Sequence, residues 1–176
     1  MIFWLHFATV VAVAAGARAQ ALDEYQLKAA FVYNFAKFVE WPPHTFKGPA
    51  DPIVICILGR NPFGHTLEET VRGKSVEGRP LVVREIGDLR HRNCQILFVS
   101  ASERARWTSI FDETGPAGVL TVGDTPGFAS SGGIVNFRIE GDRIRIRINV
   151  EAADRANLRI SSKLLSLAEI VKRPSP

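Results

Sequence analysis

The stretch from Pro52 to Gly59 most constrains the fold of this chain of 176 residues. Its central residues, Ile-Val-Ile-Cys-Ile-Leu, are uncharged and do not alternate between apolar and polar side chains. Such a run is typical of a strand buried on both faces, as in a parallel sheet covered by helices. After Gly59, Asn61 and Pro62 suit the cap and the first position of a helix. The stretch therefore predicts the first half of a doubly wound fold.

Further strands and helices alternate along the chain, which predicts right-handed crossovers and a parallel sheet. The expected elements, in order, are a helix at 62–72, strands at 79–85 and 94–100, a helix from about Ser102, and a strand at 118–123. An antiparallel hairpin follows, because two apolar arms flank a Gly-Asp turn. Its arms are 134–140 and 143–149. The predicted fold class is an α/β three-layer sandwich with a largely parallel, doubly wound sheet that ends in this hairpin and has helices on both faces.

Two helices are expected at the ends of the domain. Residues 22–41 carry an apolar stripe at three- and four-residue spacing and stop at Pro42-Pro43. This helix packs on the sheet, or it packs there and also meets another subunit. Residues 162–171 are the second expected helix. The members of the first stripe are Leu27, Phe31, Phe35, Phe38 and Val39, and those of the second are Leu164, Leu167, Ile170 and Val171.

The second arm of the hairpin alternates strictly between isoleucine and arginine. Ile144, Ile146 and Ile148 point to one face, and Arg143, Arg145 and Arg147 point to the other. Like charges on neighbouring positions repel each other and discourage pairing at a sheet edge. The arginine face is therefore interpreted as a protected edge, with a surface for an anionic partner as the alternative.

Residues 1–19 have the pattern of a secretory signal peptide. A short apolar core is followed by Ala17-Arg18-Ala19, which offers a cleavage site before Gln20. The segment before the core lacks Lys and Arg, and the alternative is an ordinary buried N-terminal helix. Export, with cleavage near Ala19, leaves 20–176 as a single α/β domain, which is enough for one core.

Charge and cysteine content narrow the classes of function. The net charge of +4 is mild and its arginines are spread along the chain, so nucleic-acid binding is not expected. Cys56 and Cys94 are the two cysteines, and in an exported chain two cysteines most often pair. Their bond would close a loop of about 38 residues and stabilise the fold by roughly 4 kcal/mol.

The sequence contains no clear catalytic or metal-binding constellation. His44, His65 and His91 are not spaced as metal ligands on a helix, and we expect neither metal nor cofactor. There is no G-x-S-x-G elbow and no G-x-G-x-x-G fingerprint. In doubly wound folds a small ligand lies beyond the carboxyl ends of the strands. The residues expected at those ends, where the Arg60 guanidinium could bind an anion, are Arg60, Asn61, Ser100, Ser102 and Asp124.

Several stretches resemble the YfiR-like family of periplasmic proteins, over nearly the whole of the chain after residue 19. The first block is Glu24 to Pro42, and the last runs from Ile148-Asn149 to Ser161-Ser162-Lys163-Leu164-Leu165-Ser166-Leu167-Ala168. Between them lie 56–59 with Asn61-Pro62-Phe63, then Gly78-Arg79-Pro80, and then 94–100. The first and last blocks are the specific ones.

The resemblance implies a regulator without enzymatic activity. YfiR-like proteins repress an inner-membrane diguanylate cyclase by binding its periplasmic part, which lowers cyclic di-GMP output and biofilm formation. The resemblance also implies a homodimer, an outer-membrane lipoprotein that sequesters the repressor, and repression that is sensitive to disulfide state. Cys56 and Cys94 match the cysteine pair that fixes the family fold. Some members carry a second pair, which this sequence lacks, so a redox switch based on that second bond is in doubt.

Two other classes of function stay open at this point. One is a periplasmic sensor domain that binds a small anionic ligand at Arg60 for another signalling system. The other is a hydrolase of unrecognised type. The sequence identifies neither the cyclase nor the inducing signal.

Overall fold

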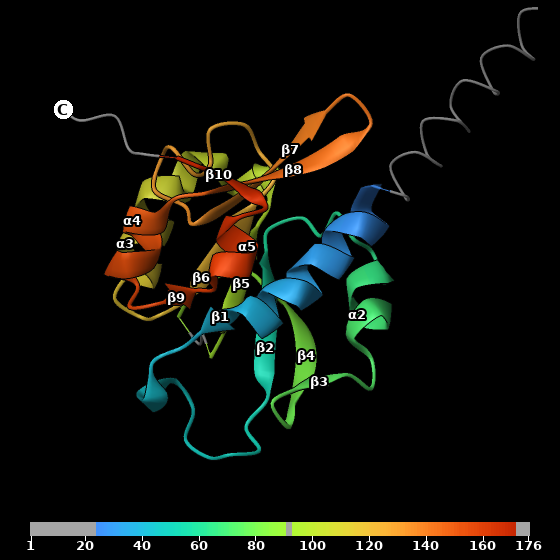
Figure 1. Cartoon of the computed structure of the whole chain (residues 1–176), viewed down its shortest axis with the longest axis vertical. Coiled ribbons are helices and arrows are strands. Elements are labelled where there is room, and N and C mark those ends of the chain that lie inside the picture. Colours follow the sequence, from blue (N-terminus) through green and yellow to red (C-terminus); the bar gives the residue numbers. More distant parts are fainter. Residues whose placement is uncertain (1–23, 91–92, 172–176) are drawn as a thin grey trace, which may run out of the picture.

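The computed structural model describes residues 24–90 and 93–171, and Figure 1 shows how their helices surround a central sheet. The strands of that sheet are β2 (Ile53–Leu58), β3 (Ser75–Val76), β4 (Arg79–Ile86), β5 (Ile96–Val99), β6 (Leu120–Gly123), β7 (Val135–Glu140), β8 (Arg143–Ile148) and β10 (Ala168–Ile170). Their order across the sheet is β10-β8-β7-β6-β5-β2-β4-β3. A second, small antiparallel sheet pairs β1 (Val39–Glu40) with β9 (Arg159–Ile160).

The centre of the large sheet is parallel, from β4 through β2, β5 and β6 to β7. The chain leaves β2 for β4 on one side and then returns to β5 on the other side, which makes the β2–β5 boundary the topological switch point. β8 pairs antiparallel with β7, as the predicted hairpin requires. The expected fold class is confirmed.

Helices cover both faces of the sheet. The elements are a helix over 24–38, η1 (Pro43–Thr45), α2 (Thr66–Val71), η2 (Ala101–Arg106), α3 (Trp107–Thr114), α4 (Val150–Arg155) and α5 (Ser162–Leu165). The helix expected from Ser102 is thus a 3₁₀ segment that continues into α3. The N-terminal helix, α2, α4 and α5 contribute to the apolar cluster on one face, and α3 contributes to the cluster on the other.

Strand β2 supplies side chains to both clusters, as its uninterrupted apolar run predicts. Ile53, Ile55 and Ile57 belong to the larger cluster, beneath the N-terminal helix. Val54, Cys56 and Leu58 belong to the smaller cluster, with α3. Successive residues of a strand point to opposite faces, and both faces of the sheet are covered here. All six side chains are therefore buried.

The N-terminal helix is shorter than expected and is rotated relative to the predicted stripe. It ends at residue 38, and the next two residues form β1 instead of a further helical turn. Leu27, expected on the buried face, is 47% exposed. The buried positions of the helix are Lys28, Ala29, Val32, Phe35 and Ala36, which also follow three- and four-residue spacing.

The expected C-terminal helix over 162–171 is wrong beyond its first turn. Only Ser162–Leu165 is helical, and Ala168–Ile170 adds the parallel edge strand β10 beside β8. Leu164 is buried as predicted, but Leu167 is 74% exposed. The sheet therefore ends in β10, one strand beyond the hairpin, and the interpretation of β8 as a protected sheet edge is wrong.

The predicted signal peptide, residues 1–19, lies outside the described residues. Among the described residues, no helix has both the length and the apolar character that a bilayer span requires.

Candidate functional site

The carboxyl ends of the central strands are held together by hydrogen bonds among the residues predicted to lie there. The backbone N–H of Arg60 donates to the Ser102 hydroxyl at 3.0 Å, and that hydroxyl lies 3.2 Å from Oε1 of Glu103. Gly59 has a left-handed φ of 87°, and an added Cβ would lie 2.7 Å from the same Glu103 oxygen. This turn favours glycine, because a residue with a Cβ would be strained at this φ.

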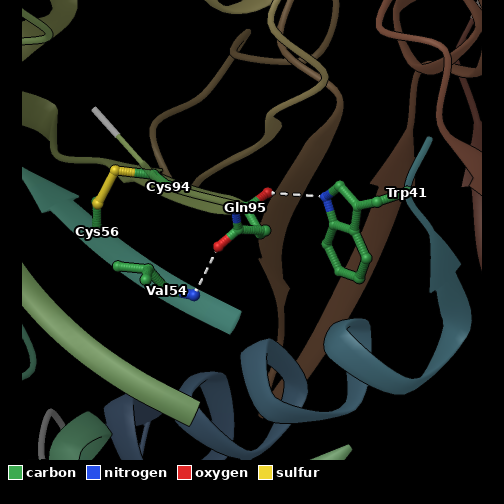
Figure 2. Close-up of a disulfide and its surroundings, with 5 residues drawn as sticks. All are labelled: Trp41, Val54, Cys56, Cys94 and Gln95. Carbon is green, nitrogen blue, oxygen red and sulfur yellow. Dashed lines mark hydrogen bonds between the residues drawn. A yellow bond between two sulfur atoms is a disulfide. The ribbon is translucent and has the colours of Figure 1, made fainter. Parts of the chain in front are cut away.

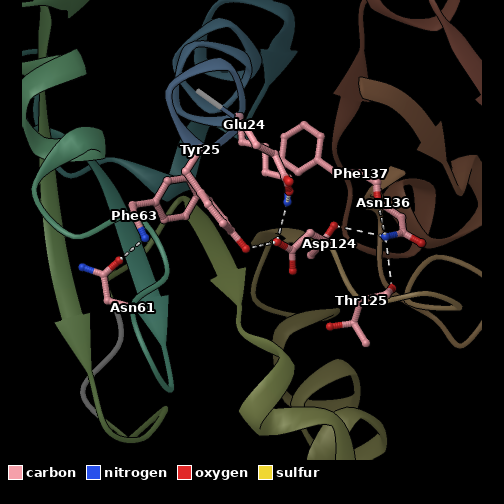
Figure 3. A network of polar contacts seen from close by, with 10 residues as sticks. Glu24, Tyr25, Asn61, Phe63, Asp124, Thr125, Asn136 and Phe137 are labelled. Carbon is pink, nitrogen blue, oxygen red and sulfur yellow. Dashed lines mark hydrogen bonds and ion pairs between the residues drawn. The ribbon is translucent and has the colours of Figure 1, made fainter. Parts of the chain in front are cut away.

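The five predicted crevice residues do not share one set of contacts. Ser100 is buried at the end of β5, and the Arg60 side chain is exposed. Asn61 accepts a hydrogen bond from the Phe63 N–H at 2.8 Å and donates to Glu85 at 2.6 Å. Figure 3 shows the aromatic rings of Tyr25 and Phe63 between Asn61 and Asp124. An anionic ligand at Arg60 stays a prediction.

Asp124, directly after β6, is bound by the N-terminal helix. Its Oδ2 accepts a hydrogen bond from Lys28 Nζ at 2.7 Å. It accepts a second one from the Tyr25 hydroxyl at 2.8 Å, which Figure 3 shows. Lys28 is 3% exposed and also pairs with Glu24. Burial and the adjacent Asp124 carboxylate raise the pKa of Tyr25 well above its usual range. The carboxylate predicted for a ligand is thus already paired with an internal cation.

At the other end of the sheet, the predicted disulfide between Cys56 and Cys94 is confirmed. Cys56 lies in β2 and Cys94 comes two residues before β5, with their Cα atoms 5.8 Å apart. Both residues are buried within the smaller apolar cluster. The bond therefore joins two neighbouring strands at the switch point of the sheet.

Gln95, the next residue, connects the disulfide to Trp41 (Figure 2). Its Oε1 accepts a hydrogen bond from the Val54 N–H at 2.8 Å. Its backbone carbonyl accepts from the Leu120 N–H at 2.9 Å and from the Trp41 indole Nε1 at 3.2 Å. Trp41 comes just after β1, so the disulfide-linked strands position the segment that follows the N-terminal helix.

Two clefts flank this segment, Trp41-Pro42-Pro43. One has a volume of about 810 Å³ and lies between the segment and the residues after α4, including Asn157 and Arg159. The other, of about 600 Å³, is bordered by Lys37, Phe46 and Arg79. Both are also lined by Glu40. We call these two hollows the Trp41 clefts.

Aromatic and cationic side chains shape the second Trp41 cleft. The rings of Trp41 and Phe46 meet edge to face, with centroids 6.4 Å apart. The Arg79 guanidinium lies 3.8 Å from the centre of the Phe46 ring and donates hydrogen bonds to the carbonyls of Gly48 and Asp51. These contacts hold the 46–51 loop against the sheet, so the cleft has fixed walls.

The sequence patterns mark Trp41 only as the end of a helix and do not single out Lys28. One signal for Lys28 was available, because a lysine in register with Val32 and Phe35 is placed on a buried helix face. Such a lysine requires a partner of opposite charge. No comparable signal identified Asp124 as that partner, since it lies 96 positions away.

Among residues 24–90 and 93–171, no group of three or more His, Cys, Asp and Glu side chains could hold a metal ion. The structure thus offers clefts and exposed surface, together with buried polar contacts that serve the fold.

Among solved structures, a conserved domain protein from Vibrio cholerae O1 biovar El Tor is similar to this chain, with a TM-score of 0.52 and 10% identity. The match covers 68% of this chain and 55% of that one, so it shows a shared fold and the chain spans about half of that relative's length. An ABC domain from Streptococcus pneumoniae, in complex with L-Trp, has a TM-score of 0.49 and 10% identity, over 67% of this chain and 55% of that one. No protein with a curated description matches.

The DUF4154 family, described as YfiR/HmsC-like, matches residues 25–169. The match begins at Tyr25, which binds Asp124, and ends at Glu169 in β10. It covers the disulfide, both Trp41 clefts and the carboxyl ends of the strands. The chain belongs to the YfiR/HmsC-like family.

Proposed function

We propose that this protein is a non-catalytic periplasmic regulator that represses a membrane-bound diguanylate cyclase by binding its periplasmic part. Membership of the YfiR/HmsC-like family supports this proposal, since YfiR-like proteins act in that way. The consequence in the cell is a lower cyclic di-GMP level and less biofilm. In this proposal, residues 1–19 direct export and are cleaved near Ala19, and residues 20–176 act as one domain.

The observation that carries the proposal is the pair of Trp41 clefts. They have volumes of about 810 and 600 Å³ and lie on either side of one short segment. Aromatic rings and arginine side chains line both of them, and these residue types are enriched in protein interfaces. A partner segment that enters both clefts would enclose Trp41, and buried aromatic residues dominate binding energy in many interfaces.

The disulfide belongs to the same proposal. Reduction releases Cys94, and Gln95 beside it holds Trp41 through its carbonyl. A looser Gln95 would leave Trp41 less fixed, so the reduced protein should bind its partner more weakly. In this proposal the single bond confers the redox sensitivity, without the second cysteine pair that some family members carry.

Two further partners are part of the proposal. An outer-membrane lipoprotein would sequester the regulator and release the cyclase, and the regulator itself would form a homodimer. Competition for one surface explains such a switch. Regulator that is bound to the lipoprotein is not available to bind the cyclase, so the cyclase is released.

A cellular assay tests the proposed function. The full chain is co-expressed with a candidate inner-membrane diguanylate cyclase, and cyclic di-GMP is measured. We expect the wild-type chain to lower cyclic di-GMP, and Glu40→Arg, which reverses a charge on both clefts, to restore it. Glu69→Arg, a charge reversal at an exposed position of α2, is the matched control and should repress like wild type. Equal repression by both variants contradicts a role for the clefts.

A further inference from the structure

A third hollow lies between α3 and α4, away from the Trp41 segment. Its volume is about 150 Å³. It exists because β6 and β7 pair only at Val122 and Gly123, so the first half of β6 has no strand beside it on that flank. The 131–134 segment bends across this gap, and an added Cβ at Gly132 would lie 3.0 Å from Phe111 Cδ2. We call this hollow the α3–α4 cavity.

Two solvent-exposed side chains of opposite charge, one from each helix, line the α3–α4 cavity. Asp112 comes from α3 and Arg155 from the last turn of α4. Within the part of the chain that the structure describes, neither side chain forms an ion pair or a hydrogen bond. A guanidinium and a carboxylate on the wall of one small cavity, each without a partner, can bind two opposite charges of a single molecule.

A buried hydroxyl adds a third polar group. Thr121 is 3% exposed and lines the cavity from β6. Its Oγ accepts a hydrogen bond from the Ile134 N–H at 3.0 Å. Among the described residues nothing accepts the proton of this hydroxyl, so it is available as a donor to a bound molecule.

We propose that the α3–α4 cavity binds a small zwitterion that carries one carboxylate and one ammonium group, as a short α-amino acid does. Arg155 and the Thr121 hydroxyl receive the carboxylate, and Asp112 receives the ammonium. The walls contributed by Phe111 and Ile134 are apolar, and they favour a ligand without further polar groups. The small volume of about 150 Å³ favours glycine or alanine over a larger amino acid.

An NMR titration of the oxidised mature protein with glycine tests the proposal. We expect the amide signals of Thr121 and Gly132 to shift in a saturable manner. Acetate and methylamine, which each carry half of the ligand, should bind at least about tenfold more weakly than glycine, because each uses only one of the two charged groups. L-Phenylalanine should leave these signals unchanged.

Matched variants test whether the charges of Asp112 and Arg155, and not charges elsewhere on the protein, are needed for glycine binding. Asp112→Asn and Arg155→Gln should each weaken glycine binding by at least about tenfold. Glu69→Gln and Arg72→Gln make the same changes at exposed positions of α2 and its C-terminal end, and should bind like wild type. The proposal is overturned if saturating glycine shifts neither cavity amide. It is also overturned if acetate binds as tightly as glycine, or if the control variants lose affinity equally.

Discussion

The indole Nε1 of Trp41 donates a hydrogen bond to the backbone carbonyl of Gln95, the residue that follows the disulfide-bonded Cys94. This contact joins the residue after β1 to the residue just before β5, over a sequence separation of 54. It gives the disulfide a direct structural connection to the Trp41 clefts.

Trp41→Phe tests this connection, because it keeps an aromatic ring and removes the donor. The free energy of unfolding should fall by about 1 kcal/mol, the usual net value of one hydrogen bond. Urea denaturation followed by circular dichroism measures the change. An unchanged transition midpoint would show that the hydrogen bond does not contribute to stability.

Removing the disulfide should destabilise the protein much more. The bond closes a separation of 38 residues, and the chain-entropy estimate for such a loop is about 4 kcal/mol. Cys56→Ala/Cys94→Ala should therefore have a clearly lower Tm than the oxidised wild type in thermal denaturation. Wild type with a reductant should approach the Tm of the variant. If the variant and the oxidised protein melt together, the bond adds nothing to stability.

The ion pair between Lys28 and Asp124 should behave as a buried pair. Lys28→Met leaves a carboxylate that is only 12% exposed without its cation, and we expect a loss of about 3–5 kcal/mol. Arg138→Met breaks the exposed pair with Glu140 and should lose less than about 1 kcal/mol. The double variant Lys28→Met/Asp124→Leu should recover part of the first loss. Additive losses would contradict direct coupling of the two residues.

Tyr25 should make stability depend on pH in the alkaline range. Its pKa is raised in the folded protein, so the folded state retains a proton that the unfolded state releases near pH 10. The stabilisation is thus complete below about pH 10 and is lost as the pH rises toward the folded pKa. Tyr25→Phe should flatten this decline in denaturation experiments between about pH 9 and 11. An equal slope in both proteins would assign the decline to other groups.

Much of the fold was predictable from local sequence patterns. The apolar run of β2 and the alternation of isoleucine and arginine in β8 each indicate one kind of strand, and both are confirmed. Ile146 and Ile148 are buried, while Arg143 and Arg145 are exposed. These patterns are reliable because a strand places alternate side chains on opposite faces of the sheet, wherever its partners come from.

The chain after α5 shows why the remainder was not predictable. Leu164, Leu167 and Ile170 fit a helix by spacing, yet the last of these lies in β10. Whether this segment forms a helix or a strand depends on β8, because Ile170 pairs with Ile148 of that strand. Ile148 lies more than twenty residues earlier in the chain. Three residues carry too weak a local preference to outweigh such a tertiary contact.

The candidate site likewise has one part that was predictable from the sequence and another that was not. The cysteine pair could be inferred from composition and export, and the structure confirms it. The Trp41 clefts depend on the packing of 41–46 against β9 and the turn before β4, which no local pattern encodes. Asp124 was expected at the end of a strand and lies there, but its pairing with Lys28 required the position of the N-terminal helix.

The most direct test of the central claim is the affinity of the oxidised protein for the purified periplasmic part of its candidate cyclase, measured by isothermal titration calorimetry. We predict saturable binding that weakens at least about tenfold in Glu40→Arg and is unchanged in Glu69→Arg. Absence of binding by the oxidised wild-type protein, or equal affinity of all three proteins, would contradict regulation through the Trp41 clefts.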